Sequence, residues 1–415
     1  MKQKSSVLLL ATSILLTLAC LGTPIPTKQT ISTVAGSPNA SYSATTTSLP
    51  AQLAELKIAY ILNGNIWRWD GSAPARQLTN NGGAVRVKIS YDGAVVAYQH
   101  GQSLRAIKAD GTSNWTLLNF PYSPPADPSY PKLLLAQFEF QPNTHWIYFN
   151  AVDYDGIYDD GLYRISIDSP AAQSLLIDGG GIITFSSDGN LLALSSATSP
   201  NINVINANGK EIVTALSYPA LDNAKSYIPQ VVWLSTGTGF YTVVPNEDGK
   251  KNRYLFVAPD GSRNAQLAEF ESVPFETSVP ILSPDGLKVA YVKHAGNMDE
   301  LRVIEASTAD TLIASYENAP MLVPSSWSPD SKWIVFSNAH PIFLLKAGIG
   351  IKPSPLTESV APNSLRWISA EHFIFFHEGE LLIGEINNPE TISIASGFSN
   401  QADTQYYDFT ANSLP

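Results

Sequence analysis

The sequence is poor in cysteine, histidine and charged residues. It contains one cysteine in 415 residues, so no disulfide can form within the chain. The six histidines are scattered and lack the spacing of zinc ligands. A G-x-S-x-G nucleophile motif and a phosphate-binding glycine loop are also missing. These absences exclude a disulfide scaffold and leave no sequence evidence for a zinc site, a serine hydrolase of that type or a nucleotide site.

The charge balance is acidic, with a net charge of −11 at pH 7. An acidic protein repels nucleic acid and anionic lipid headgroups, so we expect no nucleic-acid partner. Hydrophobic residues make up 44% of the chain, which is typical of a globular protein with a large core.

A hydrophobic run long enough to span a bilayer comfortably is missing. The longest candidate, Val7 to Ala19, follows two lysines and is typical of a secretory signal, which we place at residues 1–19. The segment Thr17-Leu18-Ala19-Cys20 resembles the lipobox of bacterial lipoproteins. That resemblance implies that Cys20 is lipidated, becomes the mature N-terminus and anchors the protein in a lipid bilayer outside the cytoplasm. The alternative is that Cys20 is an ordinary residue of the signal core.

Residues 20–53 are rich in Ser, Thr, Ala and Pro and have almost no charge. Such a segment lacks the apolar periodicity needed to fold, so we interpret it as a flexible tether. The remaining residues, 54–415, form the folded domain.

One short pattern recurs throughout this domain: an apolar residue, a tight turn and an apolar strand. The pattern is clearest in SPDGLKVAYV, which begins at Ser283, and WSPDSKWIVF, which begins at Trp327. The aligned apolar residues are Ile89, Phe140, Phe185, Trp233, Leu282, Trp327, Trp367 and Phe409. Their spacing of 40 to 51 residues is typical of propeller blades or solenoid turns.

Each repeat contains four short segments rich in β-branched and aromatic residues, which predicts four antiparallel strands. The domain is therefore predicted to be an all-β propeller. The turn residues have a structural explanation, since serine, proline and aspartate favour a tight turn and glycine allows the left-handed conformation at its end. We therefore interpret Asp92, Asp188, Asp285 and Asp330 as turn formers.

The two ends of the domain complement one another. The first repeat, from Lys57 to Thr79, has three strands and no leading strand, whereas the chain ends with a leading strand around Phe409. The C-terminal strand is therefore predicted to complete the first blade, which removes exposed sheet edges. This 1+3 closure predicts eight blades, or seven if the irregular repeat around Trp367 merges with a neighbour.

The SPDG turn and the following strand, together with RQLT at Arg76–Thr79 and PLT at Pro355–Thr357, resemble the TolB-type, WD-like repeat. That repeat also occurs in the propeller domains of prolyl oligopeptidases and dipeptidyl peptidases. The resemblance covers roughly residues 54–415 and implies a propeller. It says little about function, because these residues build turns and strands.

Two long loops are predicted to project from one face of the blade that contains Phe140. They run from Asn119 to Lys132 and from Asp153 to Gly161. Their aromatic residues are candidate ligand contacts: Phe120, Tyr122, Tyr130, Tyr154 and Tyr158. Tyr218, Tyr227, Glu247 and Asp248 of later loops extend this patch.

The second of these loops contains four aspartates, Asp153, Asp155, Asp159 and Asp160. Clustered carboxylates repel one another unless a cation neutralises them, so the loop is a candidate calcium site. A solvated acidic loop is the alternative, and no cofactor is required for the fold.

Three functions are compatible with the sequence. We expect a monomeric, lipid-anchored module that binds a protein, peptide or glycan. The alternative is an envelope enzyme that acts on a glycan or peptide and uses two carboxylates over the central channel. A purely architectural component of an envelope assembly is the third.

Overall fold

A computed structural model describes residues 53–71, 74–120, 134–152, 161–168, 173–176, 181–195, 199–209, 211–220, 227–247, 249, 251–274, 277–306, 309–317, 322–338, 343–358, 365–399 and 404–411. The chain divides into two compact units, Met1–Ser48 and Leu49–Pro415. All described residues belong to the second unit.

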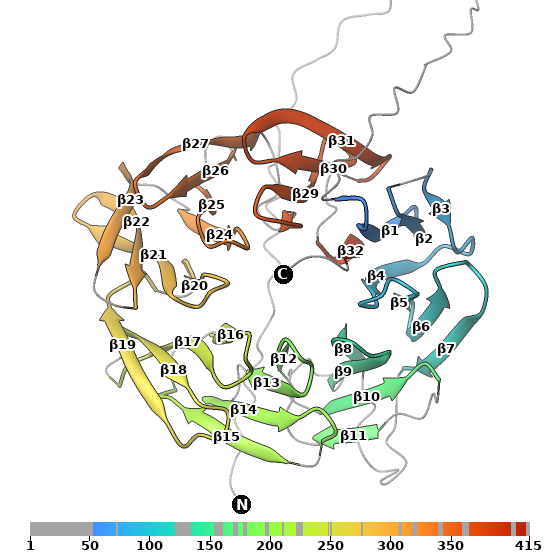
Figure 1. Cartoon of the computed structure of the whole chain (residues 1–415), viewed down its shortest axis with the longest axis horizontal. Coiled ribbons are helices and arrows are strands. Elements are labelled where there is room, and N and C mark those ends of the chain that lie inside the picture. Colours follow the sequence, from blue (N-terminus) through green and yellow to red (C-terminus); the bar gives the residue numbers. More distant parts are fainter. Residues whose placement is uncertain are drawn as a thin grey trace, which may run out of the picture. The chain divides into compact units, whose positions relative to one another are not determined.

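This unit contains eight antiparallel sheets of four strands each within its described residues. Figure 1 shows the sheets arranged in a ring, each with one strand near the centre. The prediction of an all-β propeller is confirmed, and the repeat around Trp367 forms a sheet of its own.

The strands are grouped here by their place in the sheet. The innermost strands are β32 Tyr407–Thr410, β4 Ala84–Ile89, β8 Leu134–Phe140, β12 Ile182–Phe185, β16 Val231–Trp233, β20 Ile281–Leu282, β24 Val323–Trp327 and β28 Arg366–Trp367. The second strands are β1 Lys57–Leu62, β5 Val95–His100, β9 Trp146–Val152, β13 Leu191–Ser195, β17 Phe240–Pro245, β21 Lys288–Ala295, β25 Ile334–Ser337 and β29 His372–His377. The third strands are β2 Asn65–Trp69, β6 Ser103–Lys108, β10 Leu162–Ser166, β14 Asn201–Asn206, β18 Asn252–Val257, β22 Met298–Glu305, β26 Phe343–Gly348 and β30 Glu380–Glu385. The outermost strands are β3 Arg76–Gln77, β7 Asn114–Asn119, β11 Gln173–Leu176, β15 Ile212–Ser217, β19 Asn264–Phe270, β23 Asp310–Glu317, β27 Ile351–Glu358 and β31 Asn388–Ser396.

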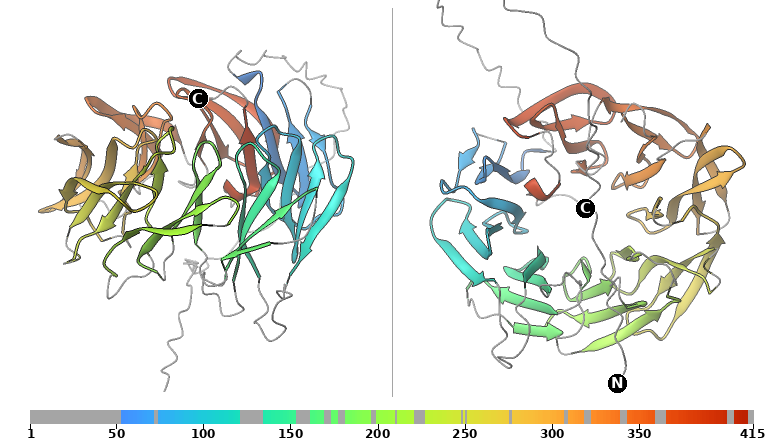
Figure 2. Two further views of the ribbon diagram at one scale, coloured as in Figure 1. Left: turned by 60° about the horizontal axis from the view of Figure 1, so that its bottom comes forward. Right: turned by 180° about the vertical axis from the view of Figure 1, so that it is seen from behind.

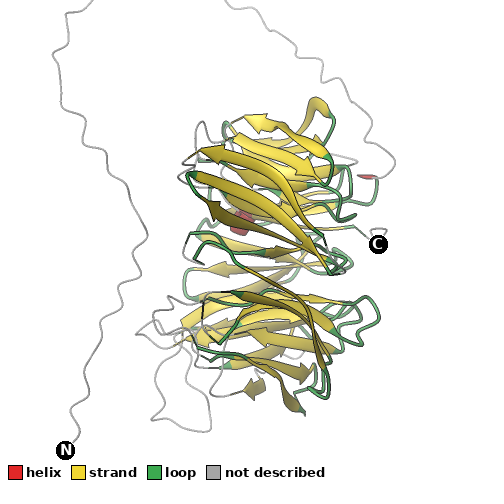
Figure 3. Cartoon of the chain, turned by 90° about the vertical axis from the view of Figure 1, so that its left-hand side faces the viewer, coloured by secondary structure: helices red, strands yellow, loops and turns green. Residues whose placement is uncertain are grey.

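Each sheet is called a blade and numbered from the N-terminus. Blade 1 contains β1–β3 and β32, blade 2 contains β4–β7, and the later blades follow in groups of four up to blade 8, which contains β28–β31. A short 3-10 helix, η3 Thr404–Tyr406, leads into β32. In the side view of Figure 3, short loops join the strands of the blades.

The core lies between neighbouring blades. In the cluster between blades 2 and 3, Val95 and Leu104 pack with Ile147 and Phe149 of the next sheet. The second strands are buried almost throughout because both faces of a blade pack against neighbours, as β5 and β29 show. Burial of one large side chain such as Phe149 stabilises the fold by about 2 kcal/mol.

The serine–aspartate turns form a repeated hydrogen-bonding unit. In the turn after Leu282, Ser283 Oγ donates to Asp285 Oδ1 and accepts from the backbone N–H of Lys288 at 3.0 Å. The same two bonds recur in the turns that begin at Ser90, Ser186 and Ser328. These four aspartates are therefore turn formers, as predicted.

The fourth turn position takes a positive φ. It is +70° at Gly286 and +58° at Ser331, which replaces the glycine in the turn after Trp327. Glycine reaches this region without the steric cost that a side chain imposes.

The first blade is completed by the C-terminal strand. β32 pairs with β1 in an antiparallel register that places Ile58 opposite Phe409 and Tyr60 opposite Tyr407. Tyr407 is fully buried, and its ring meets Phe376 of blade 8 edge-on. Figure 2 shows this red strand beside the blue first strands. The predicted 1+3 closure is confirmed.

The three aligned tryptophans also link neighbouring blades through hydrogen bonds. The indole Nε1 of Trp233 donates to Thr184 O at 2.9 Å, and that of Trp327 donates to Ile281 O at 3.2 Å. Trp367 Nε1 donates to Ser326 Oγ at 3.1 Å. Each of these bonds reaches back to the innermost strand of the preceding blade, so the central strands are held in fixed positions.

Candidate functional site

The residue just before each aligned apolar residue occupies the same position on the innermost strand of its blade. We call these eight residues the inner ring; in blade order they are Asp408, Lys88, Glu139, Thr184, Val232, Ile281, Ser326 and Arg366. Asp408 is buried, and the other seven are half-buried. Seven of the eight side chains of the inner ring therefore keep part of their surface exposed, whereas Asp408 is almost fully buried.

Charge is confined to one half of the inner ring. Passing from blade 8 through blades 1 and 2 to blade 3, the residues alternate in sign: Arg366, Asp408, Lys88 and Glu139. Blades 4 to 7 contribute neutral residues. The centre of the fold thus has a charged side, which includes the closure of the ring, and a neutral side.

Asp408 joins blade 1 to both of its neighbours. Its Oδ1 accepts from Arg366 Nη1 at 2.6 Å, and its Oδ2 accepts from the backbone N–H of Ile89 at 2.9 Å. The Arg366 guanidinium also lies 4.8 Å from the centre of the Phe409 ring, a distance that favours a cation–π interaction. These contacts hold the C-terminal strand against blades 8 and 2.

Glu139 is paired with Lys88 across blades 2 and 3. The Lys88 Nζ to Glu139 Oε1 distance is 2.5 Å. Loss of hydration among the inner strands raises the pKa of Glu139 above its ordinary value, and Lys88 opposes that rise. The side chain keeps 39% of its surface exposed, so water still reaches the carboxylate and limits the effect.

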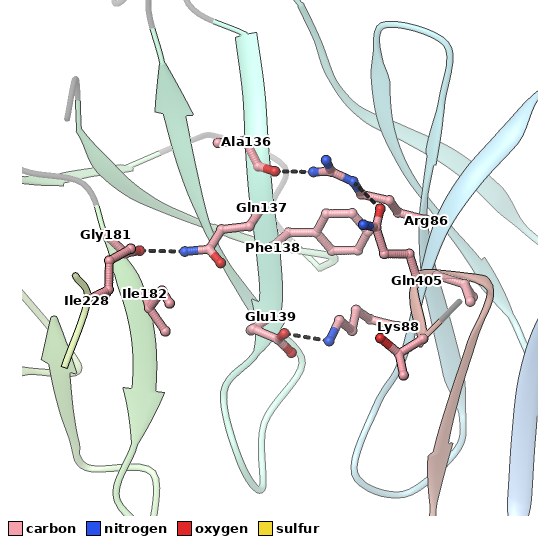
Figure 4. Close-up of a pocket in the computed structure, with 12 residues that line it drawn as sticks. Arg86, Lys88, Ala136, Gln137, Phe138, Glu139, Gly181, Ile182, Ile228 and Gln405 are labelled. Atoms are coloured by element: carbon pink, nitrogen blue, oxygen red, sulfur yellow. Dashed lines mark hydrogen bonds and ion pairs between the residues drawn. The ribbon is translucent and has the colours of Figure 1, made fainter. Parts of the chain in front are cut away.

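A pocket of about 390 Å³ opens beside this ion pair. We call it the inner pocket; the residues that define it here are Arg86, Lys88, Gln137, Glu139, Ile182 and Gln405 (Figure 4). They come from blades 2, 3 and 4 and from η3, so segments that are far apart in the sequence form one wall.

Hydrogen bonds between blades fix the polar side chains of the inner pocket. Arg86 Nε donates to Gln405 Oε1 at 3.2 Å, and Arg86 Nη1 donates to the carbonyl of Ala136. Gln137 Nε2 donates to the carbonyl of Gly181 in blade 4. The pocket therefore presents a guanidinium and two amides in positions set by β4, β8 and η3.

A second, smaller pocket of about 240 Å³ lies on the neutral side, between blades 5, 6 and 7. Gln230, Ile281 and Ser326 line it. The Gln230 side chain is already engaged, because its Oε1 accepts from the backbone N–H of Leu282 at 2.8 Å. This pocket offers fewer groups for recognition than the inner pocket.

Most of the residues predicted as site residues lie outside the described residues. These are Cys20, Tyr122, Tyr130, Asp153, Tyr154, Asp155, Tyr158, Asp159, Asp160 and Asp248. Their lipidation, ligand-binding and calcium-binding roles stay predictions. The described part of the chain contains no group of three His, Cys, Asp or Glu side chains that could hold a metal ion, and no helix long and apolar enough to span a membrane.

Three of the predicted aromatic contacts belong to the described residues, and all three are buried. Phe120 is 6% exposed and meets Phe149 edge-on in the core between blades 2 and 3. Tyr218 is 9% exposed, and Tyr227 donates from its hydroxyl to Val243 O at 2.6 Å. In this structure these rings are buried and are not open to a ligand. Glu247 is exposed and lies in a turn.

The prediction did not include the inner-ring charges or the inner pocket. The sequence nevertheless contains the information needed, because each inner-ring residue directly precedes one of the aligned apolar residues. Lys88 and Glu139 then appear in equivalent positions of consecutive repeats.

Comparisons with known proteins support the propeller fold and do not indicate a family or a function. No known family profile matches the sequence, and no curated protein matches it. Dipeptidyl peptidase 4 of Porphyromonas gingivalis is similar in structure, with a TM-score of 0.55 and 11% identity over 84% of this chain and 59% of that one. A eukaryotic initiation factor is similar with a TM-score of 0.50 and 9% identity over 87% of this chain and 99% of that one.

TolB of Acinetobacter baumannii aligns with a TM-score of 0.34 and 14% identity over 63% of each chain, a likeness too low to carry an argument. At these identities the similarities show a shared fold alone. The protein is a β-propeller.

Proposed function

We propose that this propeller is a binding module, held outside the cytoplasm by a lipid on Cys20, that binds a protein, peptide or glycan in the inner pocket. The observation that carries the proposal is the convergence of Arg86, Gln137 and Gln405 on one concave site at the centre of the ring. Concave sites with a few fixed polar groups and apolar walls are typical of ligand-binding sites.

The rigidity of the site supports binding. The polar groups sit on innermost strands or next to one, and their bonds to neighbouring blades set their orientation before a ligand arrives. A preorganised site loses less conformational entropy on binding, so more of the interaction energy appears as affinity.

A photo-crosslinking experiment tests this function. A photoreactive amino acid replaces Ile182 in the inner pocket in living cells, and the control replaces Ile212 on the outermost strand of the same blade. Both isoleucines are 45% exposed, so they differ in place and not in accessibility. We expect a defined crosslinked product at position 182 and none at position 212. Equal crosslinking at the two positions, or none at 182, would contradict the proposal.

A second candidate function is an enzyme that acts on a glycan or peptide. Two carboxylates, Glu139 and Asp408, lie on the charged side of the inner ring, and the pKa of Glu139 is raised. A raised pKa on one of two nearby acids is the pattern of acid–base catalysis in glycoside hydrolysis. Against this, each carboxylate is already paired with a cation, Glu139 with Lys88 and Asp408 with Arg366, and Lys88 opposes the rise in the pKa of Glu139.

The enzyme candidate has its own test. Purified envelope glycan and peptide fractions are incubated with the wild-type protein, with Glu139→Gln and with Glu269→Gln, whose carboxylate pairs with Lys251 on the outside of blade 5. Cleavage that is lost only in Glu139→Gln would support catalysis. Absence of cleavage, or cleavage that survives Glu139→Gln, would contradict a catalytic role for Glu139.

A further inference from the structure

We propose that the inner pocket recognises the free C-terminal carboxylate of a peptide whose last side chain is aliphatic. This inference rests on the binding function proposed above and names the chemistry of its ligand. The cation that would receive the carboxylate is Arg86, and the apolar contact would come from Ile182 and Ile228.

Arg86 is anchored and still has donors to offer. A guanidinium carries five N–H donors, of which two are used, at Gln405 Oε1 and at Ala136 O. Within the described part of the chain the structure gives the other N–H groups no acceptor. A guanidinium whose plane is fixed in this way suits two parallel hydrogen bonds to a carboxylate.

Lys88 does not compete for the ligand carboxylate, because it is already paired with Glu139 at 2.5 Å. Figure 4 shows this pair on the same wall as Arg86, with Phe138 between the two cations. An incoming carboxylate is repelled by Glu139 and attracted by Arg86. The charges therefore place the carboxylate at the Arg86 end of the inner pocket.

The rest of the pocket matches a peptide better than a sugar. Gln137 uses its Nε2 on Gly181 O, which leaves its Oε1 to accept a peptide N–H. Ile182 exposes 45% of its surface in the pocket and gains from contact with an aliphatic side chain. The aromatic ring of Phe138 is only 3% exposed, so among the described lining residues no aromatic face is open for a sugar to stack on.

The pocket volume is compatible with this ligand. About 390 Å³ falls in the usual range of about 300–1,000 Å³ for small-molecule sites, which is enough for the end of a peptide and too small for a folded domain. The ligand would contact both Arg86 and Gln405, residues 319 positions apart, so its binding would also strengthen the closure of the ring.

Methyl NMR on the full-length protein tests the inference, with isoleucine methyl groups labelled so that Ile182 and Ile228 report directly. The probes are acetyl-Ala-Ala-Leu with a free carboxylate and the same peptide with a C-terminal amide. We expect saturable shifts at both isoleucines with the free acid and binding weaker by about 10- to 100-fold with the amide, because hydrogen bonds to a charged group are lost.

Variants of Arg86 separate recognition from a general effect on folding. Arg86→Gln should weaken binding of the free acid by about 10- to 100-fold and abolish the preference over the amide. Arg86→Lys keeps the charge but not the paired donors and should fall between wild type and Arg86→Gln. Arg76→Gln removes an exposed arginine on the outermost strand of blade 1 and should bind like wild type.

The possible results of these binding experiments either support or overturn the inference. A preference for the free acid that depends on Arg86 and is read at Ile182 supports the inference. Equal affinity for acid and amide overturns it, and so does the absence of shifts at Ile182 with both peptides. In either of these cases, crosslinking that persists at position 182 would show that the proposed binding function stands with another ligand chemistry.

Discussion

Asp408 accepts hydrogen bonds from two neighbouring blades while its own strand completes a third. Its carboxylate is 10% exposed, against 33% for its partner Arg366, so this ion pair is largely shielded from water. Removing one partner of a shielded pair leaves an uncompensated charge, which is far more costly than losing an exposed pair.

We therefore predict that Asp408→Asn lowers the free energy of unfolding by about 3 kcal/mol. The matched control, Glu269→Gln, breaks the exposed pair with Lys251 and should cost less than about 1 kcal/mol. Urea denaturation of both variants measures the difference. Equal losses would show that Asp408 has no special part in closing the ring.

The hydrogen bonds of the serine–aspartate turns predict that the stability of the protein depends on pH. Partial burial raises the pKa of Asp330, but hydrogen bonds from Ser328 and Lys332 outweigh burial, so the pKa of Asp330 lies below its ordinary value. A carboxylate whose pKa is lowered by folding stabilises the protein above its unfolded-state pKa of about 3.9, and that stability is lost as the pH falls through the lower folded-state pKa.

Asp330→Asn should therefore be less stable than the wild-type protein at neutral pH. The difference in stability between the two proteins should shrink as the pH falls below about 4. Thermal melting at a series of pH values measures this convergence. A constant difference down to the lowest pH would contradict the proposed role of the ionised carboxylate.

At the scale of the element, sequence patterns predicted the turns and strands, because these depend on interactions between residues close together in the chain. The SPDG turns, the buried second strands and the C-terminal leading strand could all be predicted from short segments of sequence. The residues that determine a turn or a strand lie within about ten positions of one another. The eight blades and the 1+3 closure follow from counting those patterns.

The inner pocket could not be predicted in the same way. Its wall joins Arg86 to Gln405 across 319 positions, and Lys88 meets Glu139 only because blades 2 and 3 are adjacent. In sequence, a charged residue in a strand looks like an ordinary solvent-facing position. Long loops with aromatic residues gave the stronger local signal, yet Phe120 belongs to the buried core.

The loop between β9 and β10 carries the calcium prediction. If Asp153, Asp155, Asp159 and Asp160 bind calcium, the ion should raise the stability of the protein by about 2.7 kcal/mol at a concentration 100-fold above the dissociation constant. Differential scanning calorimetry with and without calcium measures the rise.

The double variant Asp155→Asn, Asp159→Asn should abolish the calcium effect. A control with the same change of charge, Asp110→Asn with Asp260→Asn, alters two exposed turns elsewhere and should retain it. A melting temperature that does not respond to calcium in the wild-type protein would dismiss the site.

At the scale of the whole molecule, the ring depends on its last strand. Deleting residues 404–415 removes β32, the fully buried Tyr407 and the Asp408 bridge. We predict a loss of at least about 4 kcal/mol in the free energy of unfolding, since loss of a buried large side chain alone costs about 3–5 kcal/mol.

A synthetic peptide of the deleted residues, added in excess, should restore part of the lost stability by pairing with β1. Chemical denaturation with and without the peptide provides the measurement. A truncated protein as stable as the full chain would mean that β32 is dispensable.

The lipid anchor is a separate prediction at this scale. Cys20→Ser removes the only thiol that acyl chains could modify and should move the protein from the membrane fraction to the soluble fraction. Cell fractionation and metabolic labelling with palmitate provide the readouts. Unchanged fractionation of Cys20→Ser would refute lipidation as the anchor.

The closure of blade 1 also has a consequence for the order in which the protein is made. The three outer strands of that blade leave the ribosome before blades 2 to 8, but the strand that completes them emerges after all of those blades, and the contact between Ile89 and Asp408 spans 319 residues. Blades 2 to 8 can each fold from contiguous sequence as synthesis proceeds. The nascent chain therefore carries an unpaired β1 edge while blades 2 to 8 are made, and that edge is where we expect a chaperone to bind before β32 arrives.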